Sequence, residues 1–255
     1  MAKRKKKNLF RTIAGSIVIL LILGTAGYYI SSYFYKPSFV HYKEFGISLP
    51  RQFEMHGIDV SKHQGVISWK EVKEMKVQEV QLGFAFIKAT EGIGRIDEQF
   101  RRNWFNAQKA GIIRGAYHFF IASKSGKAQA ENFLETTHLQ KGDLYPVLDV
   151  EQTFGTSAAN LQQRVADWLD MVEAKYKVKP IIYTNADFYK NFLAGRFDDY
   201  PLWVAHYLVK DKPRINRDWH FWQHSETGHV NGIESFVDFN VFSGDSTDFK
   251  KLLLR

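Results

Sequence analysis

The chain has 255 residues, of which 45% are hydrophobic, and its formal net charge is +8. This length and composition allow a sizeable core, in one large domain or two small ones. There is no cysteine, which excludes disulfides and thiolate metal sites. Residues 3–11 hold six Lys or Arg and no acid, so +2 of the net charge of +8 remains for all that follows. The later basic residues are interleaved with acids, and this pattern does not predict a nucleic-acid partner.

The amino-terminal segment is patterned like a membrane anchor. Residues 1–11 form a basic head, and residues 12–32 carry no charge over a length sufficient to cross a bilayer as a helix. Four tyrosines between residues 28 and 35 fit the aromatic belt of an interface. The head predicts a cytoplasmic amino terminus, with the rest of the chain outside the cytoplasm. The alternative is a secretory signal peptide cleaved near residues 24–27.

Residues 33–54 follow, with two prolines, many aromatic residues and no clear period. We interpret them as a stalk that leads into the domain and packs partly on it. We expect residues 55–255 to form one domain that acts as a monomer, outside the cytoplasm and tethered by a single membrane pass.

From residue 56 onward, short apolar runs alternate with helical patterns. The strands are predicted at 57–60, 80–88, 114–120, 144–150, 180–184, 202–205, 220–223 and 236–240, and the helices at 97–110, 124–137, 158–176 and 186–193. Ser157 is a plausible N-cap for the third helix. This alternation predicts an α/β fold, namely a parallel TIM-like β/α barrel. Because the last strands have little helix between them, we expect the barrel to be irregular.

Four acidic residues stand out at the ends of predicted strands: Asp59, Asp149, Glu151 and Asp238. In a barrel of this kind, ligand chemistry lies at the carboxyl ends of the strands, where we expect all four. Asp149 and Glu151 are two residues apart after a buried strand, so their side chains should enter one pocket. The less solvated carboxyl of such a pair tends to hold its proton while the other stays charged. A glycoside hydrolase needs this arrangement to protonate a leaving oxygen.

Each of these acids also has a simpler explanation. Asp149 and Glu151 could be solvated residues at the start of a loop, Asp59 a strand-end cap, and Asp238 a hydrogen-bond partner of a neighbouring loop. The buried-strand pattern before Asp149 and the presence of the other strand-end acids favour the catalytic interpretation.

Eight segments in order carry a family resemblance. They are GIDVSKHQG at 57–65, FIKATEG at 86–92, RGAYHFF at 114–120, PVLDVE at 146–151, IYTN at 182–185, LWVA at 202–205, WQHS at 222–225 and VDFN at 237–240. Together they resemble glycoside hydrolase family 25, the Chalaropsis-type lysozymes, over residues 56–245. The resemblance implies a muramidase that cleaves the β-1,4 bond between N-acetylmuramic acid and N-acetylglucosamine in peptidoglycan glycan strands. One departure is Ser68, which stands before Trp69 where family members often carry an acid.

The resemblance also assigns roles. The acids of the family map onto Asp59, Asp149, Glu151 and Asp238, with Glu151 at the general-acid position. Asp149 could stabilise a cationic sugar directly, or orient the 2-acetamido group of the substrate as an internal nucleophile, and the sequence does not decide between these roles. Further candidates for substrate binding are Tyr117, Tyr183, Trp203, Trp222 and Gln223, together with Lys88 and Glu91 as an ion pair that shapes the site. For the aromatic residues, core packing is an equal alternative, and we expect His118 to lie in the core.

No metal or organic cofactor is implied. The nine histidines form no pair on one helical face, and neither a dinucleotide fingerprint nor a P-loop is present. Two other functional classes remain open. The chain could be a non-catalytic glycan-binding protein, which would not require a matched pair of acids, or a metal-dependent hydrolase.

Overall fold

The computed structural model describes residues 20–25, 38–209 and 211–255. The predicted basic head and most of the predicted anchor lie outside these residues. None of the helices within the described ranges is long and apolar enough to span a bilayer. A compact unit covers Phe39–Arg255 and contains the whole predicted catalytic domain.

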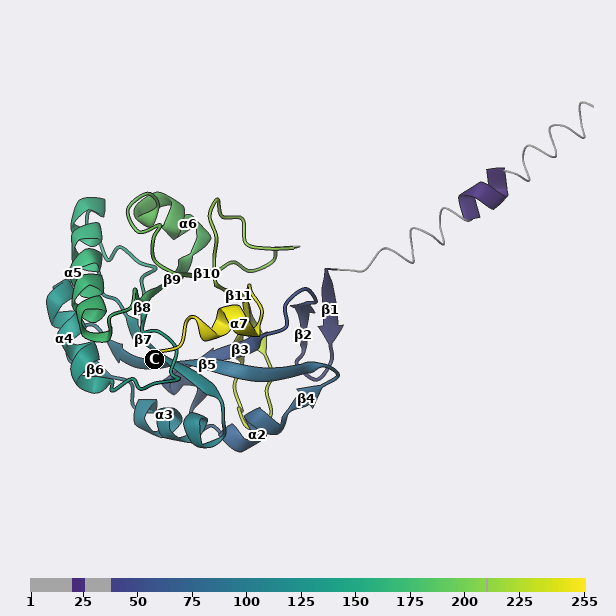
Figure 1. Ribbon diagram of the computed structural model, residues 1–255, viewed down its shortest axis with the longest axis horizontal. Coiled ribbons are helices and arrows are strands. Elements are labelled where there is room, and N and C mark those ends of the chain that lie inside the picture. The colour runs from purple at the N-terminus through teal and green to yellow at the C-terminus, as the bar shows by residue number, and fades with distance from the viewer. Residues whose placement is uncertain (1–19, 26–37, 210) are drawn as a thin grey trace, which may run out of the picture. The chain divides into compact units, whose positions relative to one another are not determined.

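Eight strands of this unit close into a barrel (Figure 1). In order around the barrel they are β3 (His56–Val60), β12 (Val237–Phe242), β11 (Phe221–Gly228), β10 (Leu202–Ala205), β9 (Ile181–Asn185), β8 (Val147–Asp149), β7 (Ile113–Phe119) and β5 (Val80–Glu91). Pairing between β3 and β5 completes the closure. Two short strands, β4 (Lys76–Val77) and β6 (Arg95–Ile96), extend β5 at its ends.

The barrel is not parallel throughout, which corrects one expectation. β12 runs antiparallel to both of its neighbours, β11 and β3, whereas the other neighbouring strands are parallel. The connection from β11 to β12 contains no helix, and a short connection of this kind joins antiparallel strands. Asp238 therefore lies near the amino end of its strand and not at the predicted carboxyl end.

Aromatic side chains fill the inside of the barrel. Phe86 stacks on Trp203 with ring centroids 4.2 Å apart, and Phe84 packs edge-on against Phe221 at 5.3 Å. The carboxyl-terminal helix α7 (Ser246–Lys250) adds Phe249 to this cluster, 5.4 Å from Phe84. Since Leu253 also bridges to Leu144, just before β8, the carboxyl-terminal segment covers the end of the barrel opposite to the strand-end acids.

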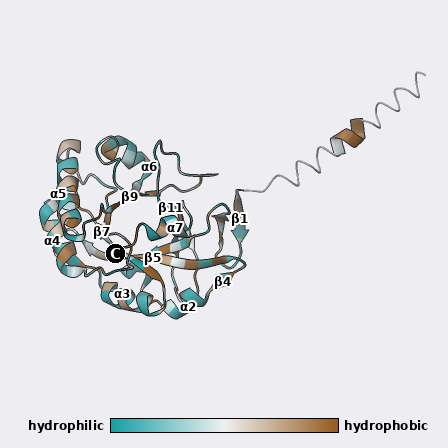
Figure 2. Ribbon diagram, viewed as in Figure 1, coloured by the Kyte–Doolittle hydropathy of each residue, from teal (hydrophilic) through white to brown (hydrophobic). Residues whose placement is uncertain are grey.

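The main helices pack on the outside of the barrel, at the left and bottom of Figure 1, and they mix hydrophobic and hydrophilic residues (Figure 2). They are α2 (Trp69–Glu74), α3 (Phe100–Lys109), α4 (Gly126–Thr136) and α5 (Ala158–Tyr176). The bounds of α5 match the prediction, and the Ser157 hydroxyl caps it by accepting from the Asn160 N–H. Ser68 occupies the N-cap position of α2 but makes no side-chain cap bond. The predicted helix at 186–193 is instead a turn of α-helix, α6 (Ala186–Phe188), followed by a π-helical turn, η2 (Tyr189–Leu193).

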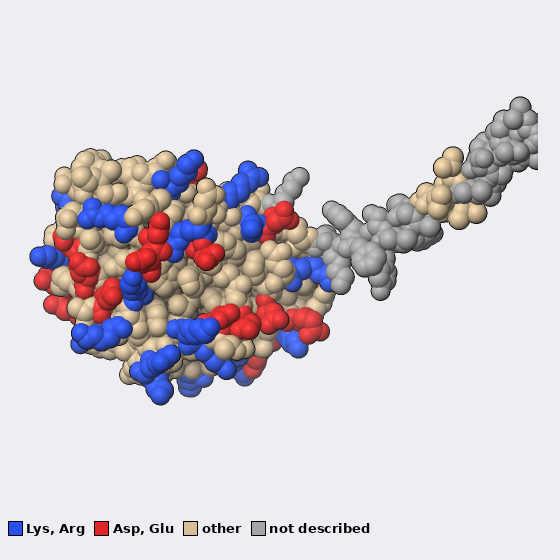
Figure 3. Space-filling model, turned by 45° about the horizontal axis from the view of Figure 1, so that its top comes forward, with Lys and Arg blue, Asp and Glu red and all other residues tan. Residues whose placement is uncertain are grey.

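Part of the predicted stalk is folded. Residues after 38 form an antiparallel hairpin of β1 (Phe39–Tyr42) and β2 (Ile47–Pro50). Phe45 and Leu49 are buried, and the Phe45 ring packs against Phe239 of the barrel at 5.2 Å. The compact unit thus begins at Phe39, whose ring packs against Trp222 of β11 with centroids 5.9 Å apart. Acidic and basic side chains are interleaved over the face shown in Figure 3.

Candidate active site

A cleft of about 430 Å³ lies where the parallel strands end. All four predicted acids line it, together with Lys88, Tyr117, Tyr183 and Gln223. A larger cavity of about 680 Å³ lies near Trp219 and Lys251 and contains none of these acids. The cleft is therefore the candidate active site.

Backbone hydrogen bonds on both sides hold the chain at Asp149. The Phe120 N–H donates to the Asp149 carbonyl at 2.8 Å, and the Val150 N–H donates to the Tyr183 carbonyl at 2.9 Å. These bonds tie the end of β8 to β7 and β9, so Asp149 and Glu151 are presented from a rigid edge. Both side chains line the cleft, as the i, i+2 spacing predicts.

Burial affects the two carboxyl groups unequally. Asp149 is only 6% exposed, and one of its oxygens, Oδ1, is buried without a hydrogen-bond partner among the described residues. Burial first and the Glu151 charge second raise the pKa of Asp149 well above its ordinary range. Burial and the charge of Asp59 raise the pKa of Glu151. The less solvated member of the pair is thus Asp149, and the pKa values of both carboxyls are shifted upward.

The second pair of acids arises from strand register. Asp59 on β3 and Asp238 on β12 are direct partners across the antiparallel ladder. Like charges in such positions repel, so the pair favours holding one proton. Burial and the charge of Asp59 raise the pKa of Asp238 to about 9. Burial also raises the pKa of Asp59, although N–H donors from Asn240 and Gln223 act in the opposite direction.

Asp59 accepts two hydrogen bonds on one oxygen. The side-chain amides of Gln223 and Asn240 each donate to its Oδ2 at 2.8 Å. The Gln223 carbonyl oxygen accepts from the Tyr183 hydroxyl at 2.8 Å and also from the Tyr207 hydroxyl. Gln223 is 2% exposed, so its main contacts are with the site itself and it presents little surface to a sugar.

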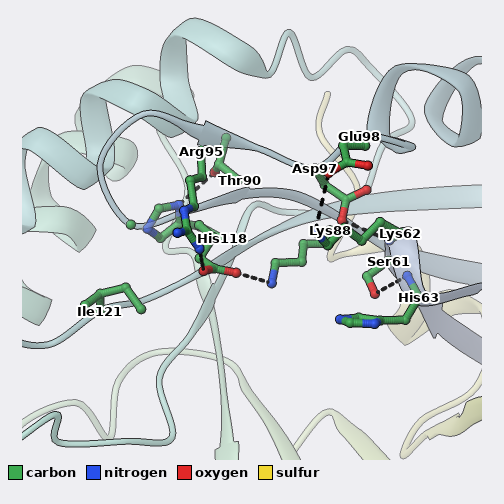
Figure 4. Close-up of polar contacts among 12 residues, drawn as sticks. Ser61, Lys62, His63, Lys88, Thr90, Arg95, Asp97, Glu98, His118 and Ile121 are labelled. Atoms are coloured by element: carbon green, nitrogen blue, oxygen red, sulfur yellow. Dashed lines mark hydrogen bonds and ion pairs between the residues drawn. The ribbon is translucent and has the colours of Figure 1, made fainter.

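Lys88 and Glu91 form the predicted ion pair, with Lys88 Nζ 2.8 Å from Glu91 Oε2. Lys88 lines the cleft and lies over the Phe119 ring at 4.6 Å, and Figure 4 shows its side chain in an extended form. Glu91 does not line the cleft, and its other oxygen accepts from Arg95 at 3.0 Å. Glu91 therefore orients Lys88 through the ion pair, from a position outside the cleft.

The four aromatic residues predicted as candidates for substrate binding divide into two groups. Tyr117 and Tyr183 line the cleft. Trp203 and Trp222 are each 1% exposed and do not line it, which corrects the expectation for both. Trp203 points into the barrel, where it stacks on Phe86, and Trp222 packs outside the barrel against Phe39 and Phe53. Adjacent residues of a strand face opposite sides, so only one of Trp222 and Gln223 can face the barrel interior.

His118 lies in the core, as predicted. Its Nδ1 is 2.7 Å from the Thr90 hydroxyl, and its Nε2 is 3.3 Å from the Gln129 carbonyl oxygen (Figure 4). Since that oxygen can only accept, the proton of the neutral ring is on Nε2. Burial lowers the pKa of His118 to about 3, which keeps the ring neutral.

Sequence reasoning missed several residues of the cleft, among them Tyr207, Glu226 and His63. It also missed Asn240, although this residue stands two positions after Asp238 in the VDFN segment. The i, i+2 rule that paired Asp149 with Glu151 would have placed Asn240 on the same face as Asp238. Among the described residues, no group of three or more His, Asp or Glu is arranged to hold a metal ion.

Comparisons with known proteins identify the family of the chain. The uncharacterized protein YegX of Escherichia coli O6:H1 is 42% identical over 252 residues, a match that covers 96% of this chain and 93% of the relative. Lysozyme M1 of Streptomyces globisporus is 37% identical over 212 residues, covering 75% of this chain and 69% of that protein. The structure of a family 25 glycosyl hydrolase from Bacillus anthracis superposes with a TM-score of 0.73 at 32% identity, over 80% of this chain and 95% of that one.

The sequence model of glycosyl hydrolases family 25 matches residues 58–233, a range that includes Asp59, Asp149 and Glu151. The match extends over more than half of the chain. The protein therefore belongs to glycosyl hydrolase family 25 and is a glycoside hydrolase.

Proposed function

We propose that the protein is an N-acetylmuramidase that hydrolyses the β-1,4 bond between N-acetylmuramic acid and N-acetylglucosamine in peptidoglycan. The observation that carries this proposal is the pair of carboxyls at the end of β8, where Glu151 faces the cleft beside the more deeply buried Asp149. The lysozymes among its relatives support the substrate class.

In this proposal Glu151 is the general acid and then the general base. Its raised pKa keeps a proton available, which passes to the glycosidic oxygen as the bond to the anomeric carbon breaks. The leaving sugar departs with this proton on its hydroxyl. Glu151, now an anion, accepts a proton from the attacking water, and the proton on the carboxyl is restored.

Asp149 supports the developing positive charge. Its Oδ1 is buried and has no partner among the described residues, whereas another part of the residue lines the cleft. In this proposal an N–H of a 2-acetamido group donates to the part of the carboxyl group that faces the cleft. Such a donor stabilises the carboxylate form, which lowers the pKa of Asp149 and leaves the Asp149–Glu151 pair with one carboxylate and one protonated acid.

A wall-digestion assay tests the proposal. Purified cell walls are incubated with the protein, and the new reducing ends are converted with borohydride and identified. We expect muramitol from the wild type, with and without a chelator, and a loss of roughly 10²–10⁴-fold in rate for Glu151→Gln, which cannot donate a proton. Glu226→Gln removes an exposed acid from the same cleft and should retain most of the activity.

The outcomes separate the alternatives. Glucosaminitol in place of muramitol would contradict the proposed bond, and loss of activity on chelation would indicate a metal-dependent hydrolase. Wall binding without any release of reducing ends would identify a glycan-binding protein. A folded Glu151→Gln variant with the wild-type rate would refute the assignment of the general acid.

We also propose that residues 12–32 anchor a monomeric enzyme in the membrane, with the catalytic domain outside the cytoplasm. The run of Lys and Arg before an uncharged stretch supports this orientation. Protease added to spheroplasts should then degrade the domain, while untreated protein stays in the membrane fraction. Recovery of a shortened soluble form would instead support cleavage of a signal peptide.

A further inference from the structure

Two buried amides meet at Asp59, and one of them has a fixed orientation. The indole N–H of Trp203 donates to Asn240 Oδ1 at 2.7 Å. An indole nitrogen can only donate, so the oxygen of Asn240 must face Trp203 and its NH₂ must face Asp59. Asn240 is 0% exposed, which leaves this amide no water to exchange partners with.

Gln223 is held in a comparable way from the other side. Its carbonyl oxygen faces the hydroxyls of Tyr183 and Tyr207, and its NH₂ donates to Asp59. Both amides reach the same carboxylate oxygen, Oδ2. N–H donors favour the charged form of a carboxyl group, and Asp238 receives no comparable amide within the described part of the chain. The proton that the two acids share therefore lies on Asp238, and the negative charge lies on Asp59.

We propose that Gln223 and Asn240 are positioning residues that place the negative charge of the Asp59–Asp238 pair on Asp59, and that this charge sets the pH range over which Glu151 keeps its catalytic proton. The inference rests on the proposed function of Glu151. Gln223 and Asn240 act through Asp59 and need not contact the substrate.

The charge of Asp59 affects the ionisation of Glu151. Glu151 shares one cleft with Asp59, Asp149, Asp238 and Lys88. A negative charge at Asp59 makes ionisation of Glu151 less favourable, whereas the Lys88 ammonium favours it. If the amides are removed, the Asp59–Asp238 pair loses the donors that stabilise its negative charge, so it binds a second proton more readily and the charge of Asp59 is lost. Glu151 then ionises at lower pH, and the enzyme loses its general acid at lower pH.

The test is the pH dependence of kcat/KM on cell walls for Gln223→Met and Asn240→Leu. These side chains have similar volumes but no N–H donors. We expect the alkaline limb of the profile to move to lower pH by about one unit, the effect of one neighbouring charge. Asp59→Asn should move it in the same direction. Trp203→Phe keeps a ring but frees the Asn240 amide, so it should cause a smaller shift of the same sign.

Trp69→Phe is the matched control. It removes an indole N–H that donates to Asn103 at 3.1 Å, in a buried Trp–Asn pair between α2 and α3, away from the cleft. Its alkaline limb should coincide with that of the wild type. If a cleft variant is inactive, titration of the Glu151 carboxyl by carbon-13 NMR, assigned by its loss in Glu151→Gln, gives the same shift without turnover.

Two outcomes overturn the inference: alkaline limbs of both amide variants that coincide with the wild type, or an equal shift in Trp69→Phe. Neither would affect the proposed function. If the alkaline limb of the wild type does not follow the NMR titration of Glu151, the assignment of the general acid itself fails.

Discussion

At the scale of single residues, the neighbours of each carboxyl group decide what it can do. Asp59 accepts two amide donors, whereas Asp149 has a buried oxygen without a partner among the described residues. The two donors thus counteract the burial that raises the pKa of Asp59. Asp149 lacks such donors, and we expect its charge to depend on what the substrate brings.

This difference makes a prediction for Asp149. If Asp149 orients the 2-acetamido group as an internal nucleophile, a cyclic thiazoline that imitates the resulting intermediate should inhibit strongly. Asp149→Asn should weaken both catalysis and thiazoline binding, because the amide cannot stabilise a cationic ring. The measurements are the rate on cell walls and the inhibition constant for each form.

An inhibitor related to the product but without the thiazoline ring is the control, and its affinity should change little in Asp149→Asn. A sugar trapped in a covalent bond to Asp149 would contradict the substrate-assisted route. Equal inhibition by the thiazoline and the control compound would also count against it.

The sequence predicted the acids of the site better than their partners. The i, i+2 spacing placed Asp149 and Glu151 in one cleft because strand alternation depends only on local geometry. Trp203 was a candidate for substrate binding with core packing as an equal alternative, and it is buried in the barrel against Phe86. Whether an aromatic residue near a strand end faces substrate or core depends on the shape of the whole barrel, which no local pattern records.

At the scale of elements, the direction of β12 was the main error. The strand itself was predicted within two residues at its ends, but its orientation was not. No helix separates β11 from β12, and parallel strands require a crossover of a dozen or more residues. The length of this connection was visible in the sequence. Antiparallel pairing is what places Asp238 opposite Asp59.

Close packing inside the barrel makes a prediction for Gly57 on β3. A Cβ at this position would lie 2.5 Å from the Phe84 ring and 2.6 Å from its carbonyl oxygen, and the carbonyl belongs to the paired strand and cannot move freely. We expect Gly57→Ala to destabilise the fold by about 1–3 kcal/mol, as overpacking does. Urea unfolding monitored by circular dichroism measures this change.

Gly83→Ala is the control on the neighbouring strand β5. A Cβ at Gly83 would meet its nearest atom, Met55 Cε, at 3.6 Å, which is an ordinary contact. Its stability should stay close to that of the wild type. Equal destabilisation by the two substitutions would show that loss of glycine in a strand, and not the contact with Phe84, is responsible.

At the scale of the whole molecule, the barrel wall separates two sets of titratable groups. Inside, burial raises the pKa of the cleft acids, such as Asp149 and Asp238. Between the barrel and its covering elements lie neutral histidines, and burial lowers the pKa of His118 and His224 to about 3 and that of His56 to about 4. Raised carboxyl pKa values favour the folded state at low pH, while lowered histidine pKa values favour it at high pH.

His224 allows the effect of a lowered histidine pKa on stability to be tested by itself. It is 6% exposed, it packs among Phe39, Trp222 and Phe239, and neither ring nitrogen has a partner among the described residues. Burial, and next the neighbouring His56, lower the pKa of His224 from 6.5 to about 3. The folded state therefore binds this proton less readily than the unfolded chain does. The resulting stability is fully present above pH 6.5 and is lost as pH falls toward 3.

We predict that His224→Phe raises the melting temperature at pH 7, because it removes a buried polar ring that forms no hydrogen bond in the described part of the chain. Below pH 6.5 its advantage over the wild type should grow by roughly 1.4 kcal/mol per pH unit, since the variant no longer carries a group that must lose a proton to fold. Calorimetry between pH 7 and pH 4.5 measures the difference. His118→Phe is the control: it breaks the contacts with Thr90 and Gln129 and should lower the melting temperature at pH 7. A constant gap between His224→Phe and the wild type across this range would mean that His224 titrates alike in the folded and unfolded states.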